Sequence, residues 1–186
     1  MIHGNREQNY IGCTTVNRYN QKGGIGVDSS PDKRIVFLAI RPRFAESIIK
    51  GEKEVEFRKV RFRAKVSHMV VYASNPVQRV LGYFQVSCIE ENDPEYLWNR
   101  YNSRGGLSRT EFLHYYGKAK NGVAITVGKI WKFREPVRVP ELDATFKIPQ
   151  NFAYLAHGMF ETILNRYPAD LIMKAQSSPR EPGLYL

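Results

Sequence analysis

Residues 34–58 read RIVFLAIRPRFAESIIKGEKEVEFR, and this stretch decides the fold. The β-branched and aromatic run over residues 34–40 predicts a buried strand. Pro42 stands where the first turn of a helix tolerates proline, and Gly51 is a typical residue just after a helix, so we expect a short helix between them. The alternation of apolar and charged residues over 54–59 then predicts a half-buried strand.

Strand patterns continue through the middle of the chain. SHMVVYAS (67–74) and RVLGYFQVSCIE (79–90) predict two strands, with Gly82 marking a bulge or a close backbone approach. GVAITVGKIWKF (122–133) predicts another. The proline-flanked residues 136–140 predict a short extended piece at a sheet edge, because proline cannot donate to a ladder.

Short helices are expected between and after these strands. Asp93 before Pro94 is a helix start, and Ser108 with Glu111 has the spacing of a capping box. Residues 159–167, MFETILNRY, predict a closing helix with an apolar face.

Together these patterns predict an α+β fold, a mixed β-barrel of five to six strands with short helices inserted and packed outside. The segment 1–32 is rich in Gly, Asn, Gln and Ser without apolar periodicity, and we expect a flexible N-terminal arm. One domain is expected over 33–157, followed by a C-terminal helix and loose tail over 158–186.

The composition favours a polyanionic partner, because 28 Lys and Arg against 18 Asp and Glu give a net charge of +10. The alternative is that these charges only solubilise the surface. Cys13 and Cys88 lack metal-ligand spacing, and so few cysteines fit a reducing compartment. No run approaches the roughly 18 apolar residues of a membrane helix. We therefore expect a cytoplasmic protein with no membrane contact, no metal and no cofactor.

Three charged residues meet where the strand over 54–59 begins. Lys53 lies at the glycine turn, while Glu56 and Arg58 share the strand face opposite Val55 and Phe57. The two cations suit phosphate oxygens, and Glu56 suits orienting a cation, accepting a base amino proton or transferring a proton. The alternative is a surface strand whose charges serve solvation and cross-strand pairing.

The stretch from Arg34 to Leu155 resembles the ASCH family, which shares the PUA-like barrel. The matching marks are FLAIRPRFAESIIKGEK, the segments VVYAS and VLGYF, and the signature G-x-K-x-x-E-x-R, met by Gly51, Lys53, Glu56 and Arg58. The resemblance implies a PUA-like domain over 33–157 with a cleft that holds RNA or single bases, modified ones included. Tyr72 and Ser74 would border this cleft, although Tyr72 would equally suit strand packing.

Half of the net charge lies within residues 41–65, where nine basic residues stand against four acidic ones. The loop RKVRFRAK (58–65) suits phosphate contacts, with Phe62 available for stacking, unless it is an ordinary solvated loop. We predict nucleic acid, RNA in preference to DNA, as the partner, and we expect Lys53→Ala and Arg58→Ala to weaken binding without unfolding the protein. The predicted binding residues are Arg41, Lys53, Glu56, Arg58, Lys59, Arg61, Arg63, Tyr72 and Ser74.

Two alternative functions remain open. Some ASCH relatives are hydrolases of acetylated cytidine or proposed ribonucleases, and the resemblance places Lys53 at their signature lysine. Their amidohydrolase pattern has a threonine nucleophile where this chain has Glu56, which argues against the same covalent mechanism. Lys53 as base with Glu56 handling a proton would instead give a metal-independent ribonuclease or a nucleoside amidohydrolase. A transcription-related protein-interaction module would be favoured by an exposed apolar patch over residues 152–155.

Overall fold

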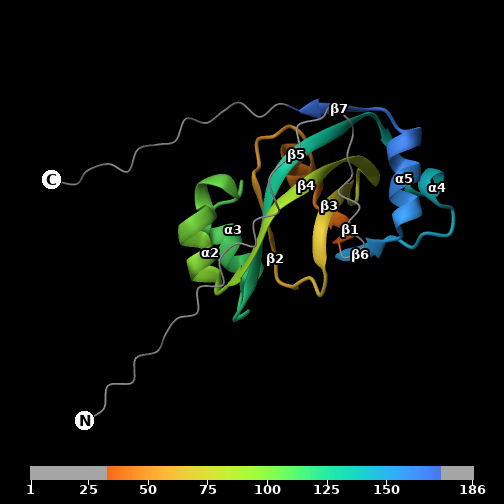
Figure 1. Cartoon of the computed structure of the whole chain (residues 1–186). Helices are drawn as coiled ribbons and strands as arrows, with labels where there is room; N and C mark the ends of the chain where they lie inside the picture. The colour runs from red at the N-terminus through yellow and green to blue at the C-terminus, as the bar shows by residue number, and fades with distance from the viewer. Residues whose placement is uncertain (1–32, 173–186) are drawn as a thin grey trace, which may run out of the picture.

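Seven strands form one mixed sheet in the computed structural model, which describes residues 33–172 (Figure 1). The strands are β1 (Lys33–Ile40), β2 (Val55–Arg58), β3 (Lys65–Ala73), β4 (Arg79–Asn92), β5 (Gly122–Val137), β6 (Phe152–Leu155) and β7 (Ala169–Ile172). Their order is β2-β5-β4-β3-β1-β6, and β7 pairs with β5 beside this path. Strands β1 and β3 are parallel, and every other pairing within the described range is antiparallel.

The predicted barrel is not confirmed, because the strands at the two ends of this order, β2 and β6, do not pair with each other within residues 33–172. The predicted α+β class is confirmed, but seven strands replace the expected five to six. Two strands were not predicted, β6 and β7, each only four residues long. Strand β6 pairs with β1, and β7 pairs with β5 over Ile130–Phe133. The predicted arm over 1–32 and the tail beyond 172 lie outside the described residues.

Five helices accompany the sheet in the described part of the chain. They are α1 (Pro42–Ile49), α2 (Pro94–Tyr101), α3 (Arg109–Tyr116), α4 (Val139–Leu142) and α5 (His157–Arg166), and a 3-10 turn, η1 (Asn102–Arg104), follows α2. The predicted helix starts are confirmed: the Asp93 side chain accepts from the Tyr96 N–H, and Ser108 and Glu111 form a reciprocal capping box.

Helix α4 corrects the prediction of an extended edge piece over 136–140. Strand β5 runs on to Val137, and Pro140 then lies in the first turn of α4. A proline is tolerated there because the first N–H groups of a helix have no partner within it. The same proline therefore suits a helix start as well as a sheet edge.

Apolar side chains cover both faces of the sheet. Along β1, Val36 and Leu38 enter the core beneath α1, whereas Ile35 and Phe37 enter the core beneath α5. Such a strand, buried on both faces, is typical of parallel pairing. In Figure 1, α2 and α3 lie at the left of the sheet beside β2, and α4 and α5 lie at the right. Helices α2 and α3 pack on β2 through a third cluster, made of Val55, Phe57, Leu97, Tyr101, Phe112, Tyr116 and Ala124.

Gly82 holds β4 close to β5, as its place in the sequence predicted. A Cβ atom at this position would lie 2.2 Å from the carbonyl oxygen of Trp131, and the register between β3 and β4 shifts beside it. A side chain there would push the two central strands apart.

One finding bears on the expectation of no membrane contact. No helix within residues 33–172 has the length and apolar character needed to cross a membrane. The reducing compartment inferred from Cys13 and Cys88 stays a prediction, because Cys13 lies outside the described residues.

Candidate functional site

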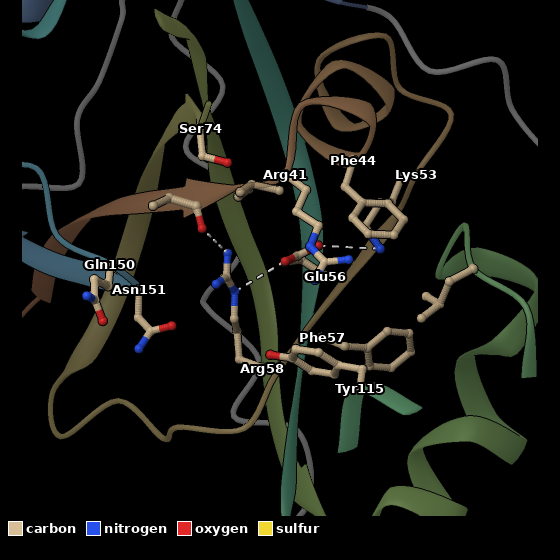
Figure 2. A pocket seen from close by; sticks show the side chains of 13 residues that line it. Arg41, Phe44, Lys53, Glu56, Phe57, Arg58, Ser74, Tyr115, Gln150 and Asn151 are labelled. Carbon is tan, nitrogen blue, oxygen red and sulfur yellow. Dashed lines mark hydrogen bonds and ion pairs between the residues drawn. The ribbon is translucent and has the colours of Figure 1, made fainter. Parts of the chain in front are cut away.

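A pocket of about 250 Å³ opens where β1 ends and α1 begins. Strand β2, the connection between α2 and α3, and the loop before β6 complete its wall (Figure 2). Its polar side chains are Arg41, Lys53, Glu56, Arg58, Ser74, Gln150 and Asn151, and its larger apolar and aromatic ones are Phe44, Phe57, Leu107 and Tyr115.

Three charges form a chain along one wall of this pocket. Glu56 lies between two cations: Oε2 is 3.4 Å from Nζ of Lys53, and Oε1 is 3.2 Å from Nε of Arg58. The exposed fractions of the three side chains are 2% for Lys53, 8% for Glu56 and 12% for Arg58. Charges this well enclosed are stable only when they are paired, so the three side chains depend on one another.

Arg58 is fixed at its far end as well. Its Nη2 donates to the carbonyl oxygen of Ala39 over 2.8 Å, which ties β2 to the end of β1. Its Nε is at ion-pair distance from Glu56 but lacks hydrogen-bond geometry to any partner among the described residues. In Figure 2 the guanidinium lies between Glu56 and the two amides of Gln150 and Asn151. Arg58 therefore lines the pocket with one buried N–H group that makes no hydrogen bond within the described residues.

Lys53 is the most enclosed charge of the site. Its Nζ donates to the carbonyl oxygens of Val55, over 2.7 Å, and of Gly105, and it lies 5.0 Å and 5.6 Å from the ring centroids of Phe44 and Phe57. Burial lowers the pKa of Lys53, and the neighbouring Glu56 opposes that effect. The three N–H donors of the ammonium group are thus directed at two carbonyls and one carboxylate.

Two further contacts attach the connection between α2 and α3 to the start of β2. The N–H of Glu54 donates to the carbonyl oxygen of Arg104 over 3.0 Å, and Nε of Arg104 donates to the Glu54 carboxylate over 2.9 Å. Lys53 and Glu54 together hold the start of the α2–α3 connection against the strand. That connection and α3 carry Leu107 and Tyr115 to the pocket, so its wall depends on this attachment.

The structure brings together five of the nine residues predicted for the site, namely Arg41, Lys53, Glu56, Arg58 and Ser74, all of which line the pocket. Lys59, Arg61 and Arg63 lie outside it, on the exposed connection that follows β2. Tyr72 also lies outside: it is 3% exposed and packs against Phe37, with 5.3 Å between ring centroids. Of the two alternatives for Tyr72, the structure has strand packing.

Two further expectations are wrong. The strand over 54–59 is not half-buried, because the face of Glu56 is enclosed by the pocket wall. Phe62 is not available for stacking: it is 8% exposed, and its ring lies 4.8 Å from that of Phe152. The apolar patch over 152–155 is largely covered too, since Leu155 is buried and Tyr154 alone of the four is exposed.

No sequence pattern indicated four further pocket residues, Phe44, Tyr115, Gln150 and Asn151. Burial raises the pKa of Tyr115, and the ammonium group of Lys59 lies 5.1 Å from the centroid of its ring. Asn151 reaches the site because its carbonyl oxygen accepts from the Ala39 N–H over 2.9 Å, extending the β1–β6 pairing. Pairing between strands so far apart in the chain has no local signal.

The pocket provides cations, one carboxylate, neutral polar side chains and aromatic walls. These groups suit hydrogen bonding, ion pairing and stacking. Within residues 33–172 no group of three or more His, Cys, Asp and Glu side chains is placed to hold a metal ion.

Comparison with known proteins shows which proteins this chain resembles. A family model described as "Domain of unknown function (DUF365)" matches residues 34–146. A Zymomonas mobilis protein named ASCH domain-containing ribonuclease is 29% identical over 132 residues, spanning 67% of this chain and 86% of that protein. A Ureaplasma parvum protein named ATP synthase subunit alpha is 32% identical over 128 residues, which span 68% of this chain but 16% of that protein. The crystal structure of ASCH from Zymomonas mobilis is similar with a TM-score of 0.68 at 26% identity, covering 74% of this chain and 98% of that one.

Proposed function

The chain belongs to the DUF365 family, a domain of unknown function, and from this membership and its likeness to ASCH proteins we propose that it binds single-stranded RNA. One base would enter the pocket beside Lys53, Glu56 and Arg58. The observation that carries the proposal is the enclosed chain of three charges in a pocket with aromatic walls. Proteins that read an unpaired base combine the same features, stacking surfaces and a few fixed polar groups.

The dimensions of the pocket support a single base. Its volume of about 250 Å³ is below the roughly 300–1,000 Å³ of pockets that enclose drug-sized ligands. Phe44 and Tyr115 supply ring surfaces at the wall, and stacking contributes about 1–3 kcal/mol per base in single-strand complexes. The sugar and phosphate would stay outside, where Arg41 is exposed at the start of α1.

The polar groups support selection of the base edge. The Glu56 carboxylate accepts hydrogen bonds from an exocyclic amino group, and the Arg58 guanidinium donates to a ring carbonyl or ring nitrogen. Lys53 plays a different part in this proposal, because its donors are directed at Val55, Gly105 and Glu56. It holds Glu56 and the pocket wall in place and does not itself contact the RNA.

A second candidate is metal-independent cleavage of RNA, which the name of the Zymomonas mobilis relative favours. Lys53 is poorly suited to act as the base, since its nitrogen donates to two carbonyl oxygens and lies beside a carboxylate. Glu56 is the better candidate for receiving a proton from a ribose hydroxyl, because its carboxylate accepts hydrogen bonds whereas the ammonium group of Lys53 only donates them. A nucleoside amidohydrolase would use the same two residues, whereas a protein-interaction module has no exposed apolar patch over 152–155 to support it.

The experiment that tests the proposal compares the wild type with Arg58→Gln and Glu56→Gln. Labelled single-stranded RNA, single-stranded DNA and duplex RNA are incubated with each protein, and retardation and cleavage are read from the same gel. The exposed Arg134, which pairs with Asp170 far from the pocket, supplies the control Arg134→Gln. Circular dichroism confirms that each variant is folded.

We expect Arg58→Gln to weaken retardation of single-stranded RNA roughly tenfold or more, since a hydrogen bond to a charged group contributes about 1.5–3 kcal/mol. Arg134→Gln should bind like the wild type. Cleavage that is lost in Glu56→Gln would establish the second candidate in place of simple binding. Equal affinity of all four folded proteins would remove the pocket from consideration.

A further inference from the structure

Five basic side chains gather at one end of the sheet beside the pocket. They come from two connections far apart in the sequence, the segment after β2 and the segment between α3 and β5, and are Lys59, Arg61, Arg63, Lys118 and Lys120, all exposed. Antiparallel pairing of Arg58 with Val123 places the end of β2 next to the start of β5. The two connections therefore meet at the same end of the sheet.

This basic end carries little compensating negative charge. Glu91, whose strand partner is Val123, lies 3.6 Å from Arg61, with both side chains largely exposed. Within residues 33–172, Arg63, Lys118 and Lys120 have no acidic side chain at ion-pair distance. Six arginines elsewhere on the surface do have such partners: Arg43 with Glu111, Arg100 with Glu90, Arg104 with Glu54, Arg109 with Glu95, Arg134 with Asp170 and Arg138 with Glu141. Arg63, Lys118 and Lys120 are therefore available to a phosphate backbone.

The basic end is continuous with the pocket. Tyr115 lines the pocket, and Nζ of Lys59 lies 5.1 Å from the centroid of its ring. The next residue, Tyr116, donates its hydroxyl to the carbonyl oxygen of Arg58 over 3.1 Å, just before the chain turns into the connection that carries Lys118. An RNA strand that left the pocket past Tyr115 would meet Lys59 first and then the other cations.

We propose that the ligand is a single-stranded oligonucleotide whose backbone continues from the pocket across this basic end, and not a free nucleoside or nucleotide. The inference rests on the proposed function and names its substrate class. A positively charged path that tracks the backbone, next to a ring on which a base stacks, is the general arrangement of single-strand binding proteins. Each phosphate neutralised on a single strand lowers the slope of log K against log salt by about 0.7.

The test is a length series of homopolymeric single-stranded RNA, from a mononucleotide to about 12 nucleotides, a span within the usual range of single-strand sites. Binding is measured by fluorescence anisotropy at several salt concentrations. The variant is Lys118→Glu with Lys120→Glu, and the control is Lys50→Glu with Lys132→Glu, the same charge change at exposed positions away from the basic end.

We expect the wild type to bind the longest oligomer at least tenfold more tightly than the mononucleotide. The Lys118→Glu/Lys120→Glu variant should lose that gain, and its slope of log K against log salt should be less negative by about 1.4, while its affinity for the mononucleotide stays unchanged. The Lys50→Glu/Lys132→Glu control should behave more like the wild type than like the variant.

Three outcomes overturn the inference, and they differ in whether the proposed role of the pocket survives. Affinity that does not grow with length, together with loss of mononucleotide binding in Arg58→Gln, would refute the basic path and keep the pocket. No binding at any length would refute the path and the proposed function together. Equal effects of the variant and its control would reduce the basic end to a nonspecific contribution of net charge and also overturn it.

Discussion

The ammonium group of Lys53 donates a hydrogen bond to the carbonyl oxygen of Gly105, which lies 52 positions further along the chain. This contact joins strand β2 to the connection that leads into α3, and the main-chain bond between Glu54 and Arg104 lies next to it. A lysine at the entrance of a charged strand looks accessible in the sequence. In the structure its side chain is buried and holds two segments together by hydrogen bonds, so its substitution should change the stability of the fold.

Replacing Lys53 by methionine should destabilise the protein. The change removes two hydrogen bonds to buried carbonyls and leaves Glu56 enclosed with Arg58 alone, and we expect a loss of about 2–4 kcal/mol in the free energy of unfolding. Urea denaturation measures it. The control is Lys50→Met, at an exposed lysine on the connection between α1 and β2. Its free energy of unfolding should stay within about 0.5 kcal/mol of the wild type.

Equal stability of these two variants would mean that the Lys53 contacts contribute nothing net. The result expected here also revises the earlier expectation that Lys53→Ala weakens binding while leaving the fold intact. Any loss of RNA binding in a Lys53 variant must therefore be corrected for the fraction of protein that is folded.

Gly105 should tolerate no side chain. A Cβ atom there would lie 2.4 Å from Cε2 of Phe57, whose ring packs against Phe112 in the cluster beneath α2 and α3. We expect Gly105→Ala to cost about 1–3 kcal/mol, the usual penalty of overpacking. The control is Gly158→Ala in α5, where nothing lies within 4 Å of the new Cβ, and it should stabilise slightly. Thermal unfolding of both variants measures these changes in stability. A Gly105→Ala variant as stable as the wild type would show that the Phe57 ring moves freely.

The capping box of α3 should make stability depend on pH in the acid range. The N–H of Ser108, and after it the guanidinium of Arg43, lower the pKa of Glu111 to about 2 from 4.5. A carboxyl group whose pKa is lower in the folded state stabilises that state at pH values above its pKa in the unfolded chain. This contribution is lost as the pH falls through the pKa of the folded state. The stability difference between wild type and Glu111→Gln should therefore be constant above pH 4.5, shrink between 4.5 and about 2, and vanish below.

Denaturant unfolding at a series of pH values measures this difference. Glu161→Gln, on the exposed face of α5, is the matched control and should show a much smaller dependence. A Glu111→Gln difference that persisted below pH 2 would mean that shape, and not charge, accounts for the effect of the substitution.

Phe62 should matter for stability and not for RNA. Its ring is buried against Phe152 beside the β1–β6 pairing, so Phe62→Leu should cost about 1–3 kcal/mol, less than the roughly 3–5 kcal/mol of a Phe→Ala change in a core. At a temperature where both proteins are folded, RNA affinity should equal that of the wild type. A specific loss of affinity would restore the stacking role that the basic loop had suggested.

Local signals were sufficient for much of the fold. Proline and glycine at the two ends of α1, the Asp93 cap and the Ser108–Glu111 capping box act through neighbouring residues, so the sequence shows them directly. Two of the three charged positions on the pocket wall, Glu56 and Arg58, also follow from strand alternation, which places them on one face. Each of these features depends on only a few consecutive residues.

The features that the sequence missed depend on distant partners. Phe62 is buried because Phe152 meets it from β6, and Asn151 reaches the pocket through the Ala39 N–H. Lys53 is enclosed because Phe44 and Gly105 come from α1 and from the connection after η1. A charged residue in a sequence is expected to be exposed to solvent. Only the packing of elements far apart in the chain shows that the charge of Lys53 is buried.

The late position of β6 has a consequence for synthesis. Strand β1 is among the most buried elements, yet one of its edges is covered by residues 152–155, pairing Ile35 with Leu155 and Leu38 with Phe152. While the ribosome is still adding residues before Phe152, β1 offers an open row of N–H and C=O groups flanked by apolar side chains. Such an edge is a template for joining another nascent chain. Expression of this protein should therefore be limited by aggregation of incomplete chains more than by the stability of finished ones.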